Sequence, residues 1–171
     1  IIRGCEIHHN TSGRRGGGIY GESGSSIEIY NIKAEDGTVI TSSHIHHNET
    51  RDYAGGIGAV GHIIEKRDDN GKIIKENNIT VIDEQKSIRA RLRLDGTLVE
   101  YNETKQQGGG GVYISRDVGK VVFGGTVIIT DNTAHMGSAY KVSNIFAEAS
   151  SKTHFEDEFS VVSYVSAKPL N

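Results

Sequence analysis

Two short motifs recur together along this chain, and their spacing restricts the fold more than any other feature of the sequence. The first is an aliphatic residue, two variable residues and an asparagine, ending at Asn10, Asn48, Asn77, Asn102 and Asn132. The second, a glycine run followed by Ile or Val, comes after three of those asparagines, at Gly16–Tyr20, Gly55–Ile57 and Gly109–Tyr113. A weaker copy lies at Gly137–Tyr140. The asparagines are 38, 29, 25 and 30 residues apart, a period typical of repeat proteins.

The composition favours strands over helices. The 171 residues include 21 Ile and 13 Val but only 4 Leu. β-branched side chains lose rotamer freedom in a helix and pack well on a pleated strand. With 4 Phe, 7 Tyr and no Trp, the core must be built mainly from Ile and Val. We therefore expect an all-β solenoid in which each repeat forms one coil of short strands and turns.

Each part of the paired motifs has a structural role in such a solenoid. Stacked strands lie roughly 4.8 Å apart, so equivalent side chains form ladders and inward Ile or Val forms apolar columns. A motif asparagine at a turn can hydrogen-bond its neighbours above and below while tolerating a left-handed backbone, and we expect the glycines to occupy sharp bends or close contacts. These roles predict about five to six coils over residues 1–140. A C-terminal capping segment over 141–171, where aromatic residues concentrate, would cover the open end.

Two segments are expected to leave the coils. An extra loop is predicted around Asn31–Gly37, where Glu35-Asp36-Gly37 is a turn signal. A charged hairpin excursion is predicted around 61–96, with its turn at Asp68–Gly71 and its return into a coil over Ile74–Asn77. Within that range, Ser87–Leu94 alternates apolar and basic residues, which predicts a half-buried strand with an exposed arginine face.

Paired histidines give the first candidate site. His8 and His9 occupy the same motif positions as His46 and His47, and His44 lies beside the second pair. Stacked imidazoles are suitable ligands for zinc or copper if the two coils are adjacent. The alternative is a solvent-facing turn ladder, since the other repeats carry different residues at these positions.

Three arginines give the second candidate site. Arg89, Arg91 and Arg93 alternate along one predicted strand face. Guanidinium groups bind carboxylates and sulfates in a bidentate manner, which suits an acidic glycan. The alternative is a solvated face neutralised by local Glu and Asp.

Several other functions find no support in the sequence. The net charge of −3 does not favour nucleic-acid binding. No apolar run approaches the ~18 residues of a membrane span. The glycine runs lack the Lys and Ser/Thr of a phosphate loop, and Asp68–Gly71 lacks the spaced ligands of a calcium loop. We therefore expect no cofactor and no catalytic residues.

The paired motifs resemble the repeats of the chlamydial polymorphic membrane proteins and of related adhesin-like surface proteins. The resemblance covers residues 1 to about 140 and implies a right-handed parallel β-helix, of the kind also found in pectin lyases, that projects from the cell surface. It implies an extracellular, non-catalytic rod that binds a glycan or a host or cell-surface protein. The translocating C-terminal β-barrel of the autotransporter-type members has no counterpart here.

Two alternatives remain at this stage. Polysaccharide lyases and glycoside hydrolases share the coil architecture. A hydrolase of this kind needs two or three carboxylates that converge from equivalent positions of neighbouring coils, and the acidic residues here are scattered. A filament or phage-tail subunit built on the same rod is the other alternative. The chain begins at Ile1 without an initiator Met, so we expect a piece of a longer polypeptide that stacks on the remainder or on another chain.

Overall fold

A computed structural model gives the structure of the chain and describes residues 1–62, 64–106, 108–115, 118–135, 144–147, 154–156 and 159–164. Within these residues the chain forms strands and no helix, and most strand pairs are parallel. The expectation of an all-β chain with parallel pairing is confirmed. Because the described residues contain no helix, none is long and apolar enough to cross a membrane.

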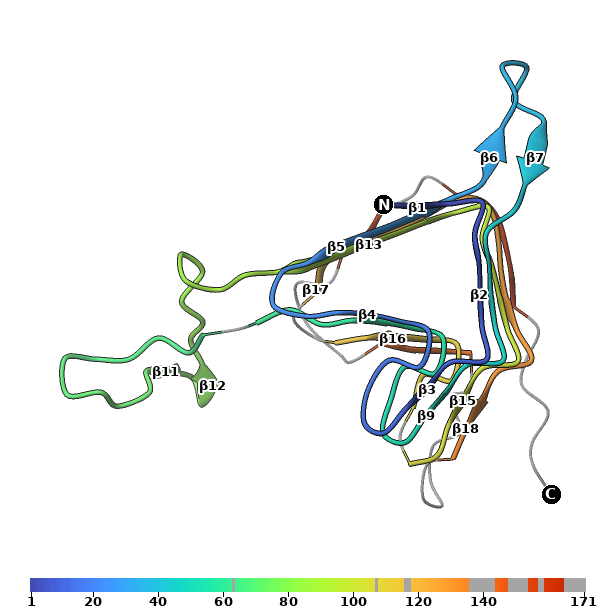
Figure 1. The fold of residues 1–171 in the computed structure, drawn as a ribbon. Coiled ribbons are helices and arrows are strands. Elements are labelled where there is room, and N and C mark those ends of the chain that lie inside the picture. The colour runs from blue at the N-terminus through green and yellow to red at the C-terminus, as the bar shows by residue number, and fades with distance from the viewer. Residues whose placement is uncertain are drawn as a thin grey trace.

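The largest sheet has nine strands and curls around the core (Figure 1). One part, here called the first wall, consists of β1 (Ile2–Arg3), β5 (Ser26–Tyr30), β13 (Ala90–Asp95), the first half of β17 (Val118–Thr130) and β20 (His154–Glu156). The other part, the second wall, consists of β2 (Glu6–His8), β8 (His44–His46), β14 (Leu98–Glu100), the second half of β17 and β21 (Phe159–Tyr164). The two walls form one sheet because β17 runs through both.

Two four-stranded parallel sheets continue the curl. The third wall is formed by β3 (Thr11–Ser12), β9 (Glu49–Thr50), β15 (Glu103–Thr104) and β18 (Thr133–Ala134). The fourth wall is formed by β4 (Ile19–Gly21), β10 (Ile57–Ala59), β16 (Val112–Ile114) and β19 (Ile145–Ala147). In every wall, strands from successive repeats lie side by side, so residues far apart in the sequence become neighbours.

The core consists of apolar columns that cross these layers in register. In the second wall, for example, Ile7 pairs with Ile45, Ile45 with Val99, and Val99 with Ile129. The first and fourth walls have equivalent columns, Ile2–Ile29–Leu94–Phe123 and Ile19–Ile57–Val112–Ile145. The expected Ile and Val columns are therefore confirmed, and burial of their side chains is the main apolar contribution to folding.

The motif asparagines form a continuous hydrogen-bonded ladder. The side-chain amide of each donates to the Oδ1 atom of the next, with distances of 2.9, 2.9, 2.9 and 3.1 Å along Asn10, Asn48, Asn102, Asn132 and Asn144. The backbone N–H groups of the first four donate to the same oxygens. The expected hydrogen bonding between stacked asparagines is confirmed. The last asparagine of the ladder among the described residues is Asn144, which does not belong to an asparagine motif.

The glycine motif is coupled to this ladder by close packing. A Cβ atom on Gly56 would lie 3.0 Å from Nδ2 of Asn102, and one on Gly111 would lie 2.7 Å from Nδ2 of Asn132. The glycine of each layer therefore contacts the ladder asparagine of the next layer. This contact explains why the two motifs recur together.

Two antiparallel excursions leave the walls (Figure 1). The strands β6 (Ile32–Lys33) and β7 (Val39–Thr41) form a hairpin, which confirms the predicted extra loop. The second excursion contains β11 (Lys75–Glu76) and β12 (Ile79–Thr80). The predicted turn at Asp68–Gly71 is also present, with the Gly71 N–H donating to the Asp68 carbonyl at 2.9 Å.

The predicted return of the chain at Ile74–Asn77 is wrong. Asn77 lies in the exposed turn between β11 and β12 with a φ of 50°, outside the asparagine ladder. No glycine motif follows Asn77 in the sequence to pack against a neighbouring layer. The chain instead rejoins the first wall at Ala90, so the excursion ends earlier than the predicted limit of residue 96.

The C-terminal region continues the walls where it is described. Strand β19 pairs in register with β16, and β20 and β21 pair with β17. The fourth strand of the fourth wall is therefore Ile145–Ala147. The weak copy of the glycine motif at Gly137–Tyr140 lies outside the described residues. Much of the predicted capping segment 141–171 also lies outside them, so its capping role stays a prediction.

Candidate metal centre and basic hollow

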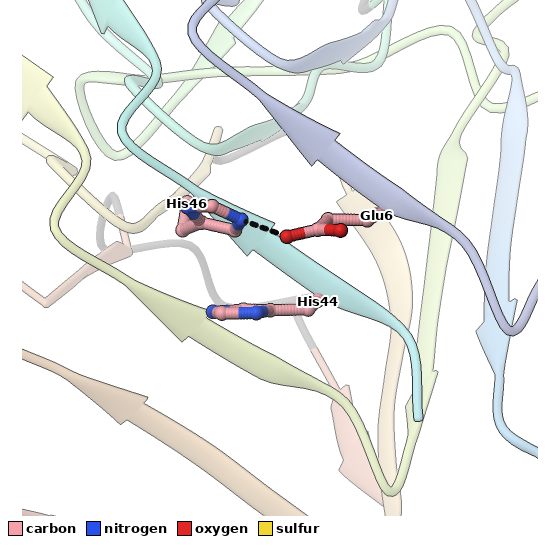
Figure 2. Close-up of side chains that lie close together, drawn as sticks. All are labelled: Glu6, His44 and His46. Carbon is pink, nitrogen blue, oxygen red and sulfur yellow. Dashed lines mark hydrogen bonds and ion pairs between the residues drawn. The ribbon is translucent and has the colours of Figure 1, made fainter. Parts of the chain in front are cut away.

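The strands β2 and β8 place ionisable side chains on the outer face of the second wall. Because side chains alternate along a strand, Ile7 and Ile45 enter the core and their neighbours face outward. Glu6 lies in register with His44, and His8 lies in register with His46. Figure 2 shows the Glu6 carboxylate and the His46 ring pointing toward each other from these two strands, with the His44 side chain beside them.

The turn after each strand adds a second histidine. His9 and His47 have φ values of 54° and 52°, and Tyr101 and Asp131 occupy the same left-handed position before the next ladder asparagines. In these layers the left-handed residue is therefore the one before the ladder asparagine and not the asparagine itself. The left-handed residue lies at the corner where the chain passes from the second wall to the third (Figure 1), and the Asn48 amide donates to the carbonyl two residues earlier, at 3.0 Å.

The four motif histidines stack between layers as predicted for adjacent coils. The rings of His8 and His46 have centroids 5.0 Å apart and nearly parallel planes, and those of His9 and His47 are 5.2 Å apart. Within each pair the two Nδ1 atoms are 2.7 Å apart, so one ring donates and the other accepts. This arrangement fixes the rings relative to one another but leaves the Nδ1 atoms engaged.

A tighter cluster is formed by Glu6, His44 and His46, whose ligand atoms all lie within 4.8 Å of one another. Glu6 Oε1 accepts a hydrogen bond from His46 Nε2 at 2.7 Å. The hydrogen bond from His46 lowers the pKa of Glu6, and the charges of His8, His46 and His44 act in the same direction against the opposing effect of burial. The carboxylate is therefore ionised at neutral pH.

Of the predicted ligands His8, His9, His46 and His47, only His46 belongs to this cluster. Glu6 was missed and His44 was noted only as a neighbour. A signal for both exists in the sequence, since Glu6-Ile7-His8-His9-Asn10 and His44-Ile45-His46-His47-Asn48 place them at the same motif position.

The three predicted arginines separate in the structure. Arg89 precedes β13 and forms an ion pair with Glu84, its Nη2 atom lying 2.9 and 3.2 Å from the two carboxylate oxygens. Arg91 is exposed, and Arg93 is partly buried with its guanidinium 5.7 Å from the ring centroid of Tyr30. The predicted half-buried strand is thus confirmed over β13, but Arg89 lies before this strand and does not line the hollow that Arg91 and Arg93 share.

Arg91 and Arg93 line a hollow of about 190 Å³ on the outer face of the first wall. Lys120 lies in register with Arg91 on the adjacent strand and also lines it. The hollow also contains Tyr30 and Glu28, whose carboxylate accepts a hydrogen bond from the Tyr30 hydroxyl at 2.8 Å. Three cationic side chains and the Glu28 carboxylate therefore line the hollow, and Arg93 also lies 3.7 Å from a carboxylate oxygen of Asp95. Sequence reasoning missed Lys120 because it lies 29 residues after Arg91.

A pair of carboxylates in the third wall was also missed. Glu49 and Glu103 lie in register, and Lys105 Nζ lies 3.3 and 2.6 Å from their respective oxygens. Burial opposes the shift, but the hydrogen bonds and charges of Lys105 and His135 hold the pKa of Glu103 below its ordinary range. An acid catalyst needs a raised pKa, so this environment suits an ion-pair network better than acid catalysis.

No protein family, no curated protein and no solved structure matches the chain.

Proposed function

We propose that the chain is a segment of an extracellular, non-catalytic rod that binds acidic glycans through its side walls. In this proposal the curled parallel sheets are part of a right-handed parallel β-helix, as the resemblance to adhesin-like surface proteins implies. Successive layers repeat the same ladders, so the walls form a rigid support. Binding residues are commonly carried on such supports.

The observation that supports glycan binding most directly is the basic hollow of the first wall. Arg91 and Lys120 lie side by side on adjacent strands, and Arg93 lies over the Tyr30 ring. The guanidinium groups suit the carboxylate or sulfate of an acidic sugar. Arg3 lies 5.6 Å from the centroid of the same ring, so Tyr30 holds two guanidinium groups near the hollow.

Replacement of both Arg91 and Lys120 with serine tests the proposal. We expect the double variant to bind a sulfated glycosaminoglycan at least tenfold more weakly than the wild type in calorimetric titration at physiological salt. Arg67→Ser is the matched control, since Arg67 is also an exposed arginine but lies on the excursion. Equal affinity of all three proteins, or equal loss in the control, would contradict the proposal.

A polysaccharide-cleaving enzyme is the second candidate, favoured by the register pair of Glu49 and Glu103 in neighbouring layers. Glycosidases use two such carboxylates. The close Lys105 and the lowered pKa of Glu103 argue for the binding function instead. Release of reducing ends by the wild type but not by Glu103→Gln would establish the enzyme and overturn the non-catalytic proposal.

A further inference from the structure

We propose that Glu6, His44 and His46 bind a first-row divalent transition-metal ion on the outer face of β2 and β8. Their ligand atoms already lie within 4.8 Å of one another. A tetrahedral zinc ion, bonded at about 2.0–2.2 Å, brings its ligand atoms to roughly 3.3 Å apart. One ligand comes from β2 and the other two from the adjacent strand β8 (Figure 2). The His44 and His46 rings are stacked with centroids 4.0 Å apart, so coordination requires the two rings to rotate until a nitrogen of each is directed at the ion.

The ligand types select the class of ion. Two imidazole nitrogens and one carboxylate oxygen suit zinc, copper or nickel, whereas calcium and magnesium prefer sites built from oxygen atoms alone. Three protein ligands leave at least one coordination position open to water or to an added ligand.

Neighbouring groups hold the two imidazoles in place. Nε2 of His44 lies 3.0 Å from Oε1 of Glu100, and Nδ1 of His46 lies 2.7 Å from Nδ1 of His47. Such outer hydrogen bonds orient metal-binding histidines and fix their tautomer. When Nε2 of His46 coordinates the ion, its Nδ1 carries the hydrogen and donates to His47.

The ligands differ in their exposure to solvent, which leaves one side of the site rigid and the other accessible. The His46 side chain is only 11% exposed, whereas the Glu6 side chain is 61% exposed. The ion therefore enters from solvent beside Glu6, whose carboxylate exchanges its hydrogen bond to His46 for a bond to the metal. Coordination joins the first layer to the second and stabilises the native state, because the unfolded chain does not hold the three ligands together.

Zinc titration of the untagged protein at pH 7.4 tests the inference. We expect one site with a Kd in the micromolar range or tighter, and a higher melting temperature with zinc. Glu6→Gln and His44→Asn should each weaken binding at least tenfold and remove the thermal shift. His135→Gln is the matched control, because His135 also pairs with a glutamate, Glu103, at 2.8 Å and lies outside the three-ligand cluster.

A cobalt spectrum and the comparison of zinc affinities decide whether the metal site exists. Cobalt should give visible absorption bands in the wild type and in the control that are absent from Glu6→Gln, whose exposed position makes it the variant least able to disturb folding. No zinc binding by the wild type, or equal affinity in wild type, Glu6→Gln and control, would overturn the inference. Because this site lies on a different wall from the basic hollow, its failure would leave the glycan-binding proposal untouched.

Discussion

Replacing Asn102 with alanine is expected to lower the free energy of unfolding by about 4 kcal/mol, since unsatisfied buried polar groups cost ~1–3 kcal/mol each. Asn102 is fully buried. Its amide nitrogen lies 2.9 Å from each of three acceptors, Asn132 Oδ1 and the carbonyls of Ile45 and Glu100, which share its two hydrogens. Its Oδ1 atom accepts from the backbone and side chain of Asn48 at 3.0 and 2.9 Å. Alanine would leave several of these groups without partners, and chemical denaturation measures the loss.

Asn77→Ala is the matched control for this change, because Asn77 ends the same four-residue motif in the sequence. Its side chain is exposed in the excursion, so we expect a loss of no more than about 1 kcal/mol, from the left-handed backbone alone. Equal destabilisation by the two substitutions would contradict the ladder described here.

Gly55→Ala is expected to destabilise the protein by about 3 kcal/mol or more, as overpacking of a close-packed interior commonly does. The added Cβ would lie 2.7 Å from both the backbone nitrogen and the carbonyl oxygen of Glu103, and against the carbonyl oxygen of Gly110. These are backbone atoms of the next layer, so relief requires the two layers to separate. Thermal and urea unfolding followed by circular dichroism measure the effect.

Gly13→Ala supplies the control for the glycine prediction. A Cβ at Gly13 meets no atom within 4 Å, so the change should alter stability by less than about 0.5 kcal/mol. If Gly55→Ala were equally harmless, close packing between the layers could not be the reason for the glycine motif.

The paired motifs predicted the stacked columns and the asparagine ladder because the residues of each motif contact the neighbouring layer. The asparagine motif without the glycine motif does not predict that a segment lies in the stacked layers. Ile74–Asn77 matches the asparagine motif but lacks the following glycines, and its asparagine has no neighbouring layer to contact. The glycine partner was the signal that separates Asn77 from the ladder asparagines.

The candidate metal site was harder to predict than the walls. Its ligands come from layers 38 residues apart, with the β6–β7 hairpin between them. Glu6 reaches diagonally to His46 rather than to its register partner His44, and strand alternation alone does not give such diagonal contacts. The position of Lys120 beside Arg91 was also hard to predict, because it depends on the register of β13 and β17.

Hydrogen exchange of the unmodified protein, followed residue by residue by nuclear magnetic resonance, tests the stacking of the repeats most directly. The backbone N–H groups of Asn48, Asn102 and Asn132 each donate to the side chain of the next ladder asparagine. We predict that these amides are among the slowest to exchange, and that the amide of Asn77 exchanges near the rate of an unfolded chain. Protection of Asn77 equal to that of Asn48 and Asn102 would contradict the account, because it would place the Ile74–Asn77 segment inside the stacked layers.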